Sequence, residues 1–354
     1  MAKTQKHIEI VTSAVRGLSS LGRTSAAAVQ TVLVRHYVRA QITTVNNRSD
    51  LDALVARRPD VVFLGMKFLP NSPALGLNDP SKIWLNEYLD GAGIACTGSD
   101  YQAHTLELTK NLAKQRVLHA GLKTARFYVA RANEPLIQDD ITLAYPMFVK
   151  PSNRGGGLGV DTDSLVHTFT QLRSKVRSIA DRFGSDALIE EYLPGREFSV
   201  GVLGSAETGE YQVMPLELVA PENDSGARFL SAQVKSADTE WHFAVTDPAL
   251  RTSINTLAID AFHALGARDY GRIDIRLDAA GVPHFLEANL LPSLLEGYGN
   301  FPKACLLNAG LGYEPMILRI VELALSRNPA ASDAPETLAH PSLLGAFEAS
   351  FEAA

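Results

Sequence analysis

The stretch that decides the fold lies at residues 270–289 and reads YGRIDIRLDAAGVPHFLEAN. It predicts two β-strands, Tyr270 to Leu277 and Pro283 to Glu287. The four residues between them, Asp278-Ala279-Ala280-Gly281, are typical of a hairpin turn. The sequence therefore predicts a β-hairpin that carries several charged side chains.

Alternate residues of a strand share one face, so Arg272, Asp274 and Arg276 are expected to point the same way. Glu287 and Asn289 share a face of the second strand. If the hairpin pairs these faces, two carboxylates, an amide and an arginine converge, and such oxygen ligands suit Mg²⁺ held against phosphates. The alternative is a charged sheet face with cross-strand ion pairs.

A glycine-rich loop follows an earlier strand. Residues 145–151 predict a strand with Lys150 near its end, and residues 152–159 read SNRGGGLG. The consecutive glycines Gly155, Gly156 and Gly157 allow backbone N–H groups to approach phosphate oxygens closely. A flexible turn beside a surface lysine is the alternative, because the pattern is neither a Walker A loop nor a Rossmann fingerprint.

A third polar motif lies at residues 188–198, which read LIEEYLPGREF. Two adjacent acids end one strand, a Pro-Gly turn follows, and Glu197 opens the next strand. This arrangement suits a ligand with hydroxyl groups, such as ribose, or else forms a solvated hairpin.

The remaining patterns predict an order of elements. The first hundred residues alternate strands (7–11, 41–45, 60–65, 93–98) with helices (26–38, 50–58, 81–89), which predicts a parallel sheet. Helices are expected at about 99–120, 165–182, 247–266 and 313–326. Strands at 187–193, 197–204 and 211–219 predict an antiparallel meander before a loop at 220–241. Residues 328–354 resemble a flexible tail with a short apolar helix at 343–351.

The composition excludes several classes of protein. The 354 residues are 46% hydrophobic and 20% charged, enough for two or three globular domains. The net charge of −6 lacks the basic footprint of a general nucleic-acid binder. Neither a membrane helix nor a targeting segment is apparent, so we expect a cytoplasmic protein. Cys96 and Cys305 are too few for a disulfide scaffold and are expected to be buried thiols.

Taken together and in this order, the motifs resemble the ATP-grasp superfamily, and within it the D-alanine–D-alanine ligase-like carboxylate–amine ligases. The resemblance extends from about Gly98 to Gly310. It implies an α/β (α+β) ATP-grasp fold with a parallel N-terminal domain at 1–98, a central domain at 99–185, a C-terminal domain at 186–326 and a tail at 327–354. ATP would lie between the antiparallel sheets of the central and C-terminal domains.

The resemblance also implies roles for individual residues. The phosphates of ATP would meet Lys110, Lys150 and the loop glycines Gly155, Gly156 and Gly157. Glu190 and Leu193 would line the adenine site, and Glu197 would bind ribose. Catalysis would use Lys235 at the γ-phosphate and Arg272 at the oxyanion. Two Mg²⁺ ions, or Mn²⁺ in their place, would be held by Asp274, Glu287 and Asn289.

The sequence departs from the family pattern where the amino acids would bind. Residues 12–19 read TSAVRGLS and lack the acid expected there, and residues 65–70 read GMKFLP in place of a His-Gly segment. Two serines of the phosphate loop are replaced by Gly156 and Gly157. After Pro292, SLLEGYG replaces the glycine and serine that receive the second carboxylate.

We therefore expect an ATP-dependent ligase that joins a small carboxylate and an amine through an acyl phosphate, on amino-acid-like substrates that differ from those of the named ligases. The alternatives are a D-alanine–D-alanine ligase of cell-wall synthesis, a nucleotide-binding protein without ligase activity, and a kinase-like enzyme. We expect neither nucleic acid nor membrane as a partner, and the resemblance implies a homodimer.

Overall fold

The structure is a computed structural model, which describes residues 3–15, 17–72, 75–223 and 226–327. Its N-terminal part is a parallel sheet, as predicted, and the four strands lie in the order β2-β1-β3-β6. The strands are β1 (Thr4–Thr12), β2 (Tyr37–Thr44), β3 (Val61–Leu64) and β6 (Ala95–Cys96). The helices between them are α1 (Arg23–His36), α2 (Arg48–Ala56) and α3 (Leu85–Gly91).

Two boundaries in this part differ from the prediction. The helix expected at 26–38 ends at His36, because Tyr37 already belongs to β2 and pairs with Thr4. The helix expected from residue 81 begins only at Leu85. Before it, β5 (Ile83–Trp84) pairs with β4 (Phe68–Leu69), and a single-turn helix lies between them at Gly76–Asn78. In both cases pairing with a distant strand overrides the local helical pattern.

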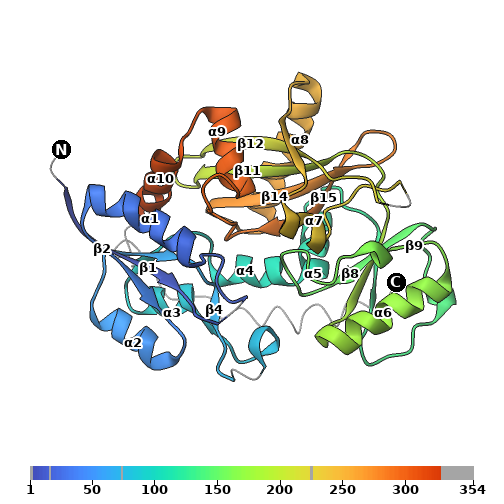
Figure 1. The fold of residues 1–354 in the computed structure, drawn as a ribbon, viewed down its shortest axis with the longest axis horizontal. Helices are drawn as coiled ribbons and strands as arrows, with labels where there is room; N and C mark the ends of the chain where they lie inside the picture. Colours follow the sequence, from blue (N-terminus) through green and yellow to red (C-terminus); the bar gives the residue numbers. More distant parts are fainter. Residues whose placement is uncertain (1–2, 16, 73–74, 224–225, 328–354) are drawn as a thin grey trace.

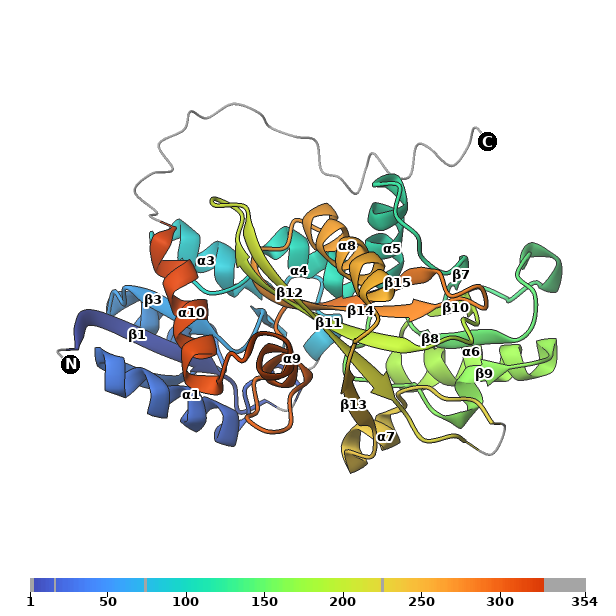
Figure 2. The same cartoon turned by 90° about the horizontal axis from the view of Figure 1, so that it is seen from above.

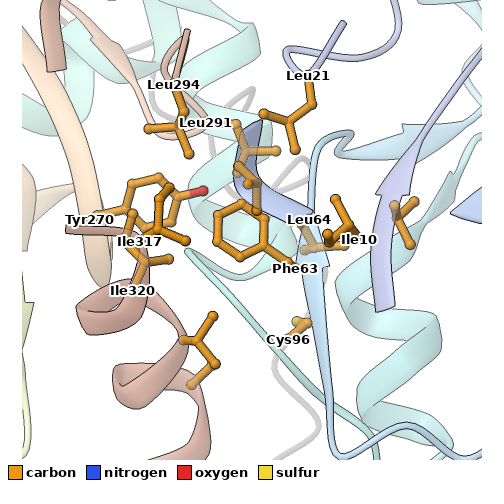
Figure 3. Close-up of a cluster of buried hydrophobic side chains, with 14 of the residues drawn as sticks. Ile10, Leu21, Phe63, Leu64, Cys96, Tyr270, Leu291, Leu294, Ile317 and Ile320 are labelled. Carbon is orange, nitrogen blue, oxygen red and sulfur yellow. The ribbon is translucent and has the colours of Figure 1, made fainter. Parts of the chain in front are cut away.

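The N-terminal sheet shares its core with the end of the chain. Helix α10 (Tyr313–Ser326) packs against α1 and β3, and Figure 3 shows Ile317 and Ile320 of α10 facing Phe63 of β3. Tyr270, which is 1% exposed, joins the same cluster from the C-terminal sheet. This shared core fixes the first sheet against the part of the chain that carries the charged hairpin.

The long helix expected at 99–120 is two helices, α4 (Tyr101–Leu108) and α5 (Lys110–His119). Asp100 caps the first, with its side chain accepting from the Ala103 amide. The helix breaks at Thr109 because the Lys110 amide donates to Ser152 O, 3.0 Å away, instead of continuing the helical ladder. The break ties the start of α5 to the end of the strand that carries Lys150.

The central sheet has the strand order β7-β10-β8-β9 and is antiparallel. Its elements are β7 (Phe127–Ala130), β8 (Met147–Pro151), β9 (Leu165–Val166), α6 (Phe169–Phe183) and β10 (Ala187–Glu191), with single-turn helices at Gln138–Asp140 and Thr162–Ser164. The helix predicted from residue 165 thus begins at Phe169. Helix α6 lies against β8 and β10 (Figure 1).

The meander predicted over residues 187–219 is wrong, because β10 pairs with β7 and β8 rather than with the strand that follows it. The Pro194-Gly195 turn leads the chain into the next sheet, where the Gly195 amide donates to Leu277 O, 3.0 Å away. A Cβ at Gly195 would come within 2.6 Å of that oxygen, so the crossing requires glycine. The expected domain boundary at residue 186 thus lies just before a strand of the central sheet; the domain division itself stays a prediction.

The third sheet is antiparallel, in the order β13-β12-β11-β14-β15. Its strands are β11 (Glu197–Ser205), β12 (Glu210–Val219), β13 (Trp241–Ala244), β14 (Asp269–Leu277) and β15 (Pro283–Asn289). Helix α8 (Pro248–Ala264) and the unpredicted α9 (Asn300–Ala309) both pack on β11 and β12, and α7 (Ala232–Ala237) lies in the segment expected as a loop. Figure 2 shows this sheet crossing the molecule between the other two.

The predicted hairpin is confirmed as β14 and β15. Both cysteines are buried free thiols, as expected, and burial raises the pKa of each to about 12. Among the described residues, none of the helices combines the length and apolar character needed to cross a bilayer. The expected apolar helix at 343–351 lies outside the described residues.

Candidate active site

Two adjoining pockets lie between the sheets. The first pocket is enclosed by the central sheet, the β14–β15 hairpin and α7, and the second pocket by the N-terminal sheet's loops and the segment after β15. The two share Leu158, Leu230 and Lys235. Every predicted site residue lines one of them: Lys110, Lys150, Gly157, Glu190, Leu193, Glu197, Lys235, Asp274 and Glu287 the first, and Gly155, Gly156, Lys235, Arg272 and Asn289 the second.

The hairpin brings its polar residues together as the strand pattern predicts. Asp274 pairs in register with Glu287, and Arg272 pairs with Asn289. The Asn289 Nδ2 donates to Asp274 Oδ2 across 3.0 Å, and the Arg272 Nε donates to Asp274 Oδ1 across 2.9 Å. The hairpin thus combines an ion pair with a convergent set of oxygen ligands.

The donor set of the hairpin fits Mg²⁺ only together with ligands from outside the protein. The described residues hold no group of three or more His, Cys, Asp or Glu side chains placed for a metal ion. Asp274 and Glu287 supply carboxylates, and Asn289 binds Asp274 through its amide nitrogen, so that its amide oxygen can serve as a further ligand. Hard cations of this kind are commonly held by one or two carboxylates plus substrate phosphates.

A buried ion-pair network forms the floor of the first pocket. The Glu190 carboxylate lies 2.7 Å from Lys150 Nζ and 2.5 Å from Lys114 Nζ. Burial favours the neutral acid, but the two lysines outweigh it and lower the pKa of Glu190. Burial also opposes the charge on Lys150, whereas Glu190 and Glu287 raise its pKa overall. The network therefore keeps Lys150 charged at the pocket surface.

A second group of cations surrounds Glu287. Lys110 Nζ lies 3.5 Å from Glu287 Oε2 and also donates to Arg154 O. Burial favours protonated Glu287, but Lys110, Lys150, Lys235 and Arg272 outweigh it and lower its pKa to about 2. Four cations therefore act on the Glu287 carboxylate, and lysines in such a position can bind the oxygens of a polyphosphate.

The predicted ribose residue is held by a partner that the sequence analysis did not assign to the site. Arg276 Nη1 donates to Glu197 Oε2 across 2.9 Å, and its guanidinium lies 5.2 Å from the centre of the Tyr192 ring. Burial raises the pKa of Glu197 despite Arg276. The alternation of residues along β14 already predicted that Arg276 shares a face of the sheet with Asp274.

The glycine-rich loop and α7 meet over the first pocket. The Ala232 amide at the start of α7 donates to Val160 O, 3.1 Å away, and a Cβ at Gly157 would lie 3.4 Å from that amide nitrogen. Gly156, Gly157 and Gly159 have φ of +65°, +79° and +78°. These conformations favour glycine, so the loop can approach a ligand with its backbone.

The second pocket contains a network that the sequence analysis did not assign. Lys67 Nζ lies 2.6 Å from Glu107 Oε1, and His104 Nδ1 lies 2.9 Å from Glu107 Oε2. The same carboxylate accepts from the Leu290 amide, directly after Asn289, across 2.8 Å. The spacing of His104 and Glu107 on one helix face was the available signal, but their link to Leu290 appears only in the fold.

Comparisons with known proteins agree with this arrangement. A family model described as the D-ala D-ala ligase C-terminus matches residues 118–322. An uncharacterized protein of Sinorhizobium fredii, y4sG, is 31% identical over 68% of this chain and 69% of its own. D-alanine–D-alanine ligase of Cupriavidus metallidurans is 30% identical over 67% of this chain and 69% of its own.

Solved structures share the fold. The structure of D-alanine–D-alanine ligase from Bacillus anthracis complexed with ATP superposes with a TM-score of 0.73 at 20% identity, covering 93% of this chain and 100% of that one. A second structure of that ligase gives a TM-score of 0.72 at 21% identity, with the same coverage. The likeness confirms the predicted ATP-grasp fold.

Proposed function

The chain belongs to the D-alanine–D-alanine ligase family of the ATP-grasp superfamily, and we propose that it is an ATP-dependent carboxylate–amine ligase with an altered amino-acid pocket. The observation that carries the proposal is the junction of the two pockets at Lys235, between a cation-rich floor and a larger cavity. A phosphoryl donor in the first pocket would meet a carboxylate in the second.

The first step that the residues support is activation of the carboxylate. A carboxylate is a poor electrophile, and transfer of a phosphoryl group to its oxygen makes an acyl phosphate. Lys110, Lys150 and Lys235 would bind the phosphates and offset the charge that develops between them. Mg²⁺ held at Asp274, Glu287 and Asn289 would neutralise further phosphate charge.

The second step joins the amine to the activated carbonyl and releases phosphate. Arg272 lines the second pocket and its guanidinium is held by Asp274 of the first, so it lies at the boundary between the two pockets. It would stabilise the oxyanion formed as the amine attacks. The glycine-rich loop and α7 would exclude water, which otherwise hydrolyses the acyl phosphate.

A phosphate-release screen over pairs of acids and amines tests this proposal. A ligase releases ADP and phosphate only when both partners are present. A nucleotide-binding protein releases neither, and a kinase releases ADP with one substrate while phosphate stays on the product. Either of the last two outcomes would overturn the proposed reaction.

D-alanine ligation itself is the second candidate, supported by the similarity of this chain to D-alanine–D-alanine ligases. Against it stand residues 12–19 and 65–67, which depart from the family pattern and whose Gly17, Ser19 and Lys67 line the second pocket. Screening D-alanine as both partners decides between the two. The homodimer stays a prediction that light scattering of the purified chain tests.

A further inference from the structure

The carboxylates that line the second pocket differ in how many hydrogen-bond and ion-pair partners they have within the protein. Three carboxylates line it, those of Asp79, Glu107 and Glu240. Asp79 accepts hydrogen bonds from the Ser72 and Ser81 amides and from the Ser81 hydroxyl. Glu107 is held by Lys67, His104 and the Leu290 amide. Two of the three acids are therefore already used by the protein.

Glu240 differs from these two acids. Its Oε2 is buried and has no hydrogen-bond partner in the part of the chain that the structure describes. A buried carboxylate oxygen without a partner loses the hydration it had in water and gains nothing in return. A cation supplied by a ligand would remove that cost.

The lysines near Glu240 are directed elsewhere. Lys303 Nζ lies 3.9 Å from the Asp238 carboxylate and 5.8 Å from the centre of the Tyr298 ring. Lys235 acts on Glu197 and Glu287 in the first pocket: its charge opposes the rise that burial causes in the pKa of Glu197 and contributes to the lowered pKa of Glu287. Neither lysine forms an ion pair with Glu240.

The opposite wall of the second pocket carries charges of both signs, and its two acids, Asp79 and Glu107, already have partners. Lys67 and Lys82 line it, and the segment at residues 17–20 contributes no carboxylate. Lys82 Nζ lies 4.5 Å from the Phe68 ring centre and 5.8 Å from that of Trp84, without an acidic side chain in contact among the described residues. The charges of Lys67 and Lys82 are offset there by Glu107 and Asp79, whose oxygens are already hydrogen-bonded. An ammonium group in this pocket would therefore be attracted to Glu240 rather than to those acids.

We propose that Glu240 binds the ammonium group of an amino-acid substrate, so that this enzyme recognises the amine from its C-terminal wall. Tyr298 borders this position, because it lines the second pocket and burial, together with the charge of Glu240, raises the pKa of its hydroxyl. That hydroxyl donates to Lys235 O across 2.6 Å. The substrate class is an amino acid whose charged nitrogen faces Glu240 while its carboxylate faces Lys82, which has no ion-pair partner among the described residues. This inference rests on the proposed ligase function for the identity of the pocket.

Matched ligand pairs test the contact without turnover. Calorimetric titration of the full chain with D- and L-amino acids and with the α-hydroxy acids of the same side chains isolates the ammonium group. For at least one side chain, the wild-type protein is expected to bind the amino acid about tenfold tighter than the hydroxy acid, as a charge-assisted hydrogen bond provides. Glu240→Gln should reduce that ratio to about one.

The control variant is Asp238→Asn, which removes the same charge two residues away. Asp238 is exposed, does not line the second pocket and has a φ of +50°, which asparagine tolerates. The preference for the amino acid should persist in Asp238→Asn. A preference that survives Glu240→Gln, or a wild-type protein that never prefers the amino acid, would overturn the proposal.

Phosphate release separates this inference from the ligase function. Hydroxylamine is largely uncharged at neutral pH and traps acyl phosphates, so it replaces the amine without needing Glu240 as an ion-pair partner. In one outcome, Glu240→Gln loses the preference for the amino acid over the hydroxy acid, but the wild-type protein releases no phosphate with hydroxylamine. That outcome would support the role of Glu240 and overturn the ligase reaction. In the other outcome, phosphate is released with hydroxylamine, but Glu240→Gln keeps the preference for the amino acid. That outcome would support the ligase reaction and overturn the role of Glu240.

Discussion

The ammonium group of Lys114 lies 2.5 Å from the carboxylate of Glu190, and both side chains are buried beneath the first pocket. Lys114 belongs to α5 and Glu190 to β10, so the ion pair joins the helix to the central sheet. Lys114 also donates to Thr124 Oγ1, whose hydroxyl bonds to Phe285 O of the C-terminal sheet. One buried lysine therefore connects the two sheets that border the first pocket.

Replacing this lysine tests its structural contribution. Lys114→Met should lower the free energy of unfolding by about 3 kcal/mol, because it removes one partner of a buried ion pair. Urea denaturation measures the loss. The double variant Lys114→Met with Glu190→Gln should lose less than the sum of the single variants, and additive losses would show that the two groups do not interact.

The acidic hairpin should be required for turnover and not for folding. Asp274→Asn and Glu287→Gln are each expected to reduce phosphate release more than about a hundredfold, because each removes charge that would hold Mg²⁺ against the phosphates. Circular dichroism should match that of the wild-type protein. Near-normal release by both variants at saturating Mg²⁺ would refute the metal assignment.

Glu107 should make the free energy of unfolding fall as the pH is lowered. Burial opposes its charge, but Lys67 and His104 outweigh burial and lower its pKa from 4.5 to about 2. A carboxylate with a lowered pKa stabilises the fold above the pKa of the unfolded chain and loses that effect as the pH falls from about 4.5 towards 2. Glu107→Gln should therefore be less stable by about 3 kcal/mol at pH 7, with a smaller difference at pH 3. A difference that is constant from pH 7 to pH 3 would contradict this.

The glycine-rich loop should tolerate alanine unequally. Gly159 has a φ of +78°, and a Cβ there would lie 2.5 Å from Pro151 Cγ, so Gly159→Ala should lower the free energy of unfolding by about 1–3 kcal/mol. Gly155 has nothing within 4 Å of the same atom and no positive φ. Gly155→Ala should therefore stay within about 0.5 kcal/mol in the same urea titration. Equal losses in both variants would mean that space around the loop does not decide its sequence.

Local pattern alone located most of the site. The alternation in β14 and β15 fixes which side chains share a face, so Asp274, Glu287, Arg272 and Asn289 could be grouped from the sequence. The glycine run and Lys150 were visible for the same reason, because strand and loop are adjacent in the chain. Where the pattern depends on neighbours in sequence, the sequence is sufficient.

Local pattern failed where a distant partner decides the outcome. Thr109 breaks a helix because Ser152 accepts the next amide, and β10 leaves the predicted meander because it finds β7 and β8. No periodicity encodes either partner.

The sequence by itself determined the ATP-grasp identity, the hairpin and the phosphate loop, since each depends on residue types at fixed spacing. Only the tertiary structure decided that Glu190 lies between two lysines and that Glu240 has a carboxylate oxygen without a partner. The physical reason is that burial and charge pairing depend on which surfaces meet in the fold, and these surfaces come from segments far apart in the chain.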